Sequence, residues 1–308
     1  MPPHGHADQA NPRGVARVAE LPESAAVAAW DHLFLAAGMK ERLLSQALFS
    51  LAHRHRLRSE RTALHGLLVL AGPPGTGKTT TARALASMAA TRLAAKGDTT
   101  LVEIDPHGLP SEMFGESQRN VAKLLGSALP ELAGERRFTI CIVDEIEALA
   151  VRRSTASFDT NPADLHRATD AVLTGLDGIA ANHPQLLIIA TTNFPAAVDE
   201  AVLSRADLVV GFDPPDHGAA AAILRDTLDE LAGLWPGLAT IADDEARLAQ
   251  LATACAGLDG RRLRKLVLSA ITLRPETAVD ASRLTFDDLF VAADAGQSDV
   301  AVKPQRSA

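Results

Sequence analysis

The run Gly72-Pro-Pro-Gly-Thr-Gly-Lys-Thr79 contains residue types whose spacing suits the binding of phosphate. Glycines let backbone N–H groups curve around phosphate oxygens at a helix N-terminus, while Lys78 can reach the β and γ oxygens and the Thr79 hydroxyl can ligate magnesium. The run lies between an apolar segment and a helical pattern, which is the context that a P-loop requires. We therefore expect a nucleoside triphosphate to be bound by Gly72, Pro73, Pro74, Gly75, Thr76, Gly77, Lys78, Thr79 and Thr80.

A second acidic motif follows an apolar run in Thr139-Ile-Cys-Ile-Val-Asp-Glu145, which is a Walker B pattern. Asp144 is expected to hold Mg²⁺ through water, and Glu145 to orient the water that attacks the γ-phosphate. The metal site would thus combine Thr79 with Asp144. The alternative is a buried strand that ends in two solvated acids.

Asn193 follows a third apolar run, in Ala190-Thr-Thr-Asn193. Ligands of open α/β sheets collect at the carboxyl ends of the strands, so an amide there could help position the same water. The alternative is an Asn that caps a turn or a helix before Pro195.

The elements that must position these residues are short apolar strands separated by longer helical patterns, which predicts a doubly wound α/β fold with a five-stranded parallel sheet. The expected strands are Leu67–Ala71, Leu101–Ile104, Phe138–Val143, Leu186–Ala190 and Leu208–Phe212. Two helices are expected to lead into this domain, which spans 24–213, with the helices within 24–57. A small helical lid domain is expected at 214–295, and flexible tails at 1–23 and 296–308.

Composition narrows the class of protein. The 308 residues carry a net charge of −8 and are 47% hydrophobic, which is typical of a soluble globular chain and unfavourable for binding a polyanion. Two cysteines, Cys141 and Cys255, are too few for a disulfide framework, and no run of 18 apolar residues is present. We expect a cytoplasmic protein without membrane segments. The histidines, among them His107, lack metal-ligand spacing, and no nucleophile elbow is visible.

The motifs in this order resemble the AAA+ superfamily of ATPases. More narrowly, the sequence resembles the pachytene-checkpoint (thyroid-receptor-interactor) family, which remodels HORMA-domain proteins. This similarity runs from about Trp30 to Phe290. It is carried by Leu101-Val-Glu-Ile-Asp, Met113-Phe-Gly-Glu-Ser117, Asn161-Pro-Ala-Asp, Ala171-Val-Leu-Thr-Gly-Leu-Asp177, Ser204-Arg-Ala-Asp-Leu208 and Gly257-Leu-Asp-Gly-Arg-Arg-Leu-Arg-Lys-Leu266.

The resemblance implies a homo-hexameric ring that binds ATP with Mg²⁺ and completes each site with Arg205 of the neighbouring copy. Without the resemblance, a surface salt bridge from Arg205 to Asp207 would be the better interpretation. The resemblance also implies that Arg261 contacts the nucleotide as a second sensor, with Arg264 as its rival. On periodicity these arginines would otherwise lie on the solvated side of a helix.

The family places a substrate-gripping loop in the ring's pore, which the resemblance assigns here to Met113, Phe114 and Gly115. Met113 stands where relatives usually carry a large aromatic residue. The alternative is a pair of apolar side chains that pack beneath a loop. Arg152 and Arg153 are weaker candidates for charges that act between subunits.

Similar bacterial proteins act in cyclic-oligonucleotide anti-phage signalling (CBASS), where they disassemble a complex of a HORMA protein with a CD-NTase-like nucleotidyltransferase. The resemblance implies these partners here, and it suggests direct engagement of substrate because only about 30 residues precede Trp30. We expect no nucleic-acid partner. Two alternatives stay open: a DNA-handling AAA+ protein such as a transposition helper or loader, and a nucleotide-gated scaffold.

Overall fold

A computed structural model describes residues 11–57, 62–109, 116–134, 136–150 and 162–301. The expected pore loop (Met113, Phe114 and Gly115) and the pair Arg152 and Arg153 lie outside these ranges. The chain divides into two compact units. The sheet unit comprises Met1–Trp30, Lys40–Gly72 and Lys78–Gly211, and the helical unit comprises Asp31–Met39, Pro73–Gly77 and Phe212–Ala308.

The sheet unit is built on six strands in the order β1-β3-β4-β5-β2-β6. The five strands from β2 to β6 are parallel, and β1 pairs with β3 in the antiparallel direction. The expected α/β class and its parallel strands are confirmed. The strands are β1 (Val15–Leu21), β2 (Leu67–Ala71), β3 (Thr99–Ile104), β4 (Phe138–Val143), β5 (Leu186–Thr192) and β6 (Leu208–Gly211).

Strand β1 corrects the prediction that residues 1–23 form a flexible tail, and it adds a sixth strand to the five expected. From Arg17 to Leu21 the strand pairs with Glu103 to Thr99 of β3. Most of its side chains are exposed or half-buried, and only Val15 is buried. Because backbone hydrogen bonds rather than an apolar face hold this edge strand, its sequence lacks the pattern that marks a buried strand.

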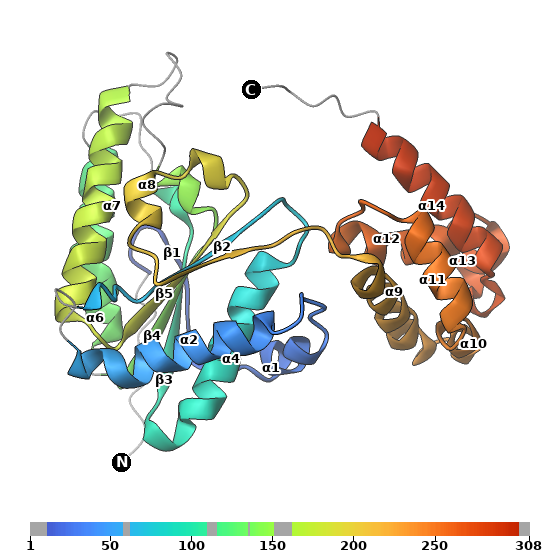
Figure 1. Ribbon diagram of the computed structural model, residues 1–308, viewed down its shortest axis with the longest axis horizontal. Coiled ribbons are helices and arrows are strands. Elements are labelled where there is room, and N and C mark those ends of the chain that lie inside the picture. The colour runs from blue at the N-terminus through green and yellow to red at the C-terminus, as the bar shows by residue number, and fades with distance from the viewer. Residues whose placement is uncertain (1–10, 58–61, 110–115, 135, 151–161, 302–308) are drawn as a thin grey trace. The chain divides into compact units, whose positions relative to one another are not determined.

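Helices cover both faces of the sheet, as Figure 1 shows for α7 along one side and α2 and α4 along the other. Alternate strand residues such as Val69, Cys141 and Ile188 share one core with α5, α6 and α7. The intervening strand residues are also fully buried, since both faces are covered. The helices are α1 (Ser24–Asp31), α2 (Met39–His53), α4 (Lys78–Leu93), α5 (Glu116–Lys123), the π-helix η4 (Leu124–Ala128), α6 (Leu129–Ala133), α7 (Pro162–Asn182) and α8 (Glu200–Leu203).

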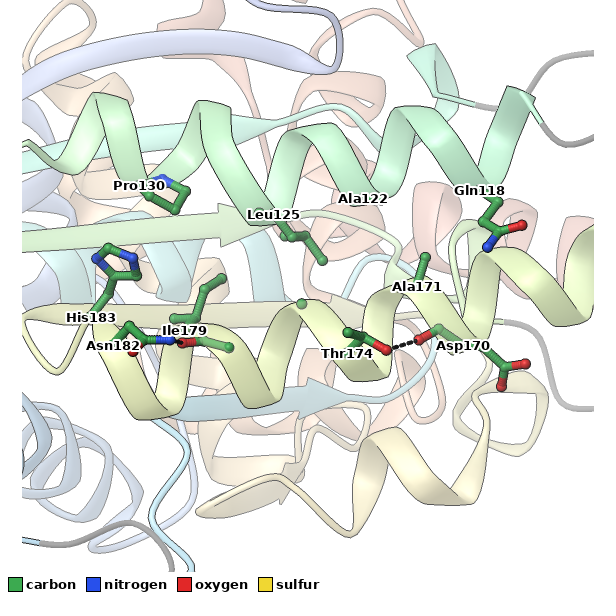
Figure 2. Close-up of a pocket in the computed structure, with 13 residues that line it drawn as sticks. Gln118, Ala122, Leu125, Pro130, Asp170, Ala171, Thr174, Ile179, Asn182 and His183 are labelled. Carbon is green, nitrogen blue, oxygen red and sulfur yellow. Dashed lines mark hydrogen bonds between the residues drawn. The ribbon is translucent and has the colours of Figure 1, made fainter.

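A groove of about 330 Å³ runs between α7 and the helices α5 and α6 (Figure 2). Gly175 brings the two layers close together, because a Cβ added there would lie 2.6 Å from Leu125 Cβ. The glycine is therefore required by packing rather than by backbone conformation.

The helical unit has a core of its own, formed by α9, α11, α12 and α14 with Phe34 packed against it. Its helices are α9 (His217–Ala232), α10 (Ala239–Ala242), α11 (Glu245–Ala254), α12 (Gly260–Ile271), α13 (Pro275–Val279) and α14 (Phe286–Ala301). Helix α14 continues through Ala301, so the prediction that a flexible tail begins at 296 is wrong. Among the described residues, no helix is long and apolar enough to cross a membrane.

Candidate active site

The predicted phosphate-binding loop joins the carboxyl end of β2 to the first residue of α4, as the motif requires. Gly75 and Gly77 adopt φ values of +84° and +90°, which L side chains rarely tolerate. Thr76 Oγ1 donates to the Pro73 carbonyl over 2.9 Å, and Lys78 Nζ donates to the Gly72 carbonyl over 2.7 Å. The lysine ammonium is thus folded over the loop at the N-terminus of α4, where an anion is favoured.

The Thr79 hydroxyl and the Asp144 carboxylate lie together, with Thr79 Oγ1 donating to Asp144 Oδ1 over 2.9 Å. Mg²⁺ in phosphate-transfer sites is usually held by one or two side chains together with waters and phosphate oxygens. A hydroxyl beside a carboxylate fits that donor set. Among the described residues, no cluster of three or more His, Cys, Asp or Glu side chains could hold a metal by itself.

Glu145 follows Asp144 in a left-handed backbone conformation, with φ of +56°. Asn193 Nδ2 donates to Glu145 Oε1 over 2.7 Å, and His107 Nε2 lies 2.9 Å from Glu145 Oε2. The Glu145 side chain remains 42% exposed, so its carboxylate can still reach a water molecule. A carboxylate that is oriented by two donors and open to solvent can polarise such a water.

Asn193 stands at the end of β5 and His107 follows β3 in the short helix η3 (Pro106–Gly108), so both reach Glu145 from strand ends at one sheet edge. The side-chain amide of Asn193 bonds Glu145, so the alternative of a purely turn-capping Asn is not what the structure shows. The contact from His107 was not expected. Its only sequence signal is its place just after β3, at the edge where ligands collect.

Arg205 lies near the amino-terminal ends of the parallel strands, because it precedes β6, which runs parallel to β2. The phosphate-binding loop follows the carboxyl end of β2. Its guanidinium forms two hydrogen bonds to Asp177, at 2.7 and 2.9 Å, and this bonding lowers the pKa of Asp177. The expected alternative partner, Asp207, instead accepts from the backbone N–H groups of His65 and Gly66. The five residues of β2 lie between Arg205 and the phosphate-binding loop along the strand direction, and they span about 16 Å.

Within the helical unit, α12 begins beside Gly75 of the phosphate-binding loop. The Arg261 N–H donates to the Gly75 carbonyl over 3.3 Å, and no described residue forms a hydrogen bond or ion pair with its guanidinium. Arg264 differs, because its guanidinium pairs with Asp226 at 2.9 Å and also donates to the His32 carbonyl. Arg264 therefore links residues of the helical unit to one another, whereas Arg261 is bonded to the loop through its backbone N–H.

A P-loop, an adjoining acidic pair and an Asn on a parallel sheet, together with a separate helical unit, define an AAA-type ATPase. The model of the ATPase family associated with various cellular activities (AAA) matches residues 68–214. CD-NTase-associated protein 6 of Pseudomonas aeruginosa is 40% identical over 282 residues, which cover 92% of each chain. The chain belongs to the AAA ATPase family, in the group that includes CD-NTase-associated protein 6.

A pachytene checkpoint protein 2 homolog of Oryza sativa subsp. indica is 31% identical over 82% of this chain, and the match spans 60% of that protein's length. Two of the solved structures that share the fold illustrate the match. One is C. elegans PCH-2, with a TM-score of 0.75 at 24% identity, covering 96% of this chain and 78% of that chain. The other is the E. coli MS115-1 HORMA:CdnC:Trip13 complex, with a TM-score of 0.71 at 18% identity, covering 91% and 95%. The predicted family resemblance is confirmed, and the chain is an ATPase.

Proposed function

We propose that the chain hydrolyses ATP with Glu145 orienting the attacking water and Asn193 orienting Glu145. The observation that carries this proposal is the 2.7 Å hydrogen bond between the two side chains, next to the pair formed by Thr79 and Asp144. Lys78 binds the β and γ oxygens. Thr79 and Asp144 would hold Mg²⁺, which would neutralise charge that develops on the phosphates.

The proposed arginine finger is Arg205 of a neighbouring copy. A γ-phosphate on the chain's own loop lies too far away, since about 16 Å of strand β2 separates the two edges. A second copy is therefore needed to bring the Arg205 guanidinium to the phosphate, which supports a ring of identical subunits with heterologous contacts. A hexamer is the proposed closed form of this ring.

Arg261 is proposed as the sensor that contacts nucleotide from the helical unit, because its backbone is bonded to Gly75 and its guanidinium has no partner among the described residues, while that of Arg264 is paired. Hydrolysis would then change the angle of the helical unit and move the proposed pore loop of Met113, Phe114 and Gly115. The output is mechanical work on a bound polypeptide.

We propose that this polypeptide is a HORMA-domain protein, and that the chain releases it from a CD-NTase-like nucleotidyltransferase. Support comes from the relative named as a CD-NTase-associated protein and from the shared fold with a chain of a HORMA:CdnC:Trip13 complex. The regulated system would be an anti-phage signalling pathway in the cytoplasm.

The test measures ATP turnover and complex disassembly together. A HORMA-domain protein and a CD-NTase-like nucleotidyltransferase that bind each other are assembled, the ATPase is added with ATP and Mg²⁺, and the complex is followed by size-exclusion chromatography. We expect release by the wild type and none by Glu145→Gln. Salt-dependent binding of duplex DNA with no effect on the complex would instead support a DNA-handling AAA+ protein.

A further inference from the structure

Backbone hydrogen bonds between β4 and β5 end just before the proposed catalytic residues. Side chains supply the hydrogen-bond acceptors beyond that point. The parallel ladder between the two strands ends at the pair Val143 and Ala190. Beyond it, each strand still has backbone N–H groups that require acceptors. Two of these belong to Glu145 and Asn193, the two residues whose side chains meet.

The acceptors come from side chains of the opposite strand end. Thr191 Oγ1 accepts from the Glu145 N–H over 3.1 Å, and Glu147 Oε1 accepts from the Asn193 N–H over 3.0 Å. The two contacts are reciprocal, since one runs from Glu145, which follows β4, to β5, and the other runs from Asn193, just after β5, to Glu147 in the short helix Ile146–Ala148 that follows β4. We call Thr191 and Glu147 the side-chain clasp.

Thr191 makes a second contact that links both acidic residues of the Walker B motif. Its hydroxyl donates to Asp144 Oδ1, the oxygen that also accepts from Thr79. One hydroxyl therefore fixes the carboxylate of Asp144 and the backbone of Glu145, whose φ of +56° is a conformation that needs such support.

The position of Glu147 carries a free-energy cost for the fold. Its Oε2 is buried and has no hydrogen-bond partner within the part of the chain that the structure describes. A buried carboxylate oxygen without a donor destabilises a fold. We interpret this cost as offset by the role of the other oxygen, Oε1, which fixes the backbone of Asn193.

We infer that Thr191 and Glu147 are positioning residues of the ATPase site: Thr191 sets the Walker B acids, and Glu147 acts through Asn193. This inference rests on the proposed roles of Glu145 and Asn193. Neither clasp residue is expected to touch ATP, so removing either should change kcat rather than KM.

The chain offers a matched control for Thr191→Val. Thr139, on β4, is also a buried Thr, but no described residue forms a hydrogen bond with its hydroxyl. The same loss of a hydroxyl should therefore be harmless at Thr139 and costly at Thr191. Thr191→Ser keeps the hydroxyl and should restore the function.

ATP turnover is measured over a range of ATP concentrations for the full chain with Mg²⁺, alongside fluorescent-ATP binding and thermal unfolding. We expect Thr191→Val to lower kcat about tenfold or more, the effect of a lost hydrogen bond to a charged group. KM should change by less than about threefold, because nucleotide contacts persist. Thr191→Ser and Thr139→Val should stay within about threefold of wild type in both parameters.

Glu147 is tested by a double-mutant cycle, which stays informative if Thr191→Val fails to fold. Glu147→Ala should lower kcat in the wild type but add less than about twofold to Asn193→Ala, because its effect passes through Asn193. Full additivity in the cycle, or normal turnover by Thr191→Val, would overturn the inference. Glu145→Gln serves as the reference: normal turnover by that variant would refute the proposed function itself.

Discussion

The position of Arg205 makes a quantitative prediction about mixtures of two inactive variants. Glu145→Gln damages the half of the site that holds the phosphates, and Arg205→Ala damages the half that a neighbour is proposed to supply. Each variant alone should lose about 10³-fold in turnover, since an arginine finger and a water-orienting residue both act on the transition state.

The expected recovery follows from counting sites in a mixed ring. An intact site needs Glu145 from one copy and Arg205 from the next. With equal, random incorporation, about one quarter of the sites meet both conditions in a ring with heterologous contacts. The co-expressed mixture should therefore turn over ATP at about 25% of the wild-type rate per site, hundreds of times faster than either parent.

The assay is phosphate release by co-expressed, doubly tagged rings, compared with each variant alone. A mixture of Glu145→Gln with Asn193→Ala is the matched control, because both changes damage the same half and no intact site can form. Turnover of the first mixture that equals the sum of its parents would refute the trans role of Arg205. It would also contradict the inference that Arg205 and the phosphate-binding loop, at opposite ends of β2, cannot meet within one chain.

Three further outcomes are expected. Arg261→Ala should weaken ATP binding or turnover about tenfold at an unchanged melting temperature, whereas Arg264→Ala should lower that temperature and spare ATP affinity; the reverse pattern would exchange their roles. Gly175→Ala should lower the free energy of unfolding in urea, because overpacking against Leu125 costs about 1–3 kcal/mol and the gain in helix propensity is about 1 kcal/mol; a stabilised variant would contradict this packing. The lowered pKa of Asp177, caused first by its hydrogen bond from arginine, contributes stability above its unfolded pKa of about 3.9 that is lost as pH falls through the lower folded value. Asp177→Asn should flatten acid unfolding below about pH 4, and an unchanged pH profile would argue against it.

The sequence predicted the parallel core of the fold because that core has a strong hydrophobic signal. Strands β2 and β4 begin and end at the predicted residues, Leu67–Ala71 and Phe138–Val143. Both are buried on both faces, so every residue is apolar or small. Strand β1 was missed because an edge strand held by backbone bonds needs no continuous apolar run.

The candidate site could be predicted only as far as residue type reveals chemistry. The loop at Gly72 and the acids Asp144 and Glu145 were found by pattern, and the structure brings Asn193 to Glu145. Partners such as His107 and Asp177 depend on which strand ends and helices become neighbours. That information lies in the strand order, which local periodicity does not contain.

Strand β1 has a practical consequence for anyone who shortens this chain. A truncated protein that starts at Ser24 would lack the strand bonded along β3 and leave a row of amides and carbonyls on β3 facing water. An unprotected border of that kind invites pairing with other molecules. Shortened versions that precipitate should accordingly be rescued by restoring the segment from Asn11, before the ATPase itself is judged defective.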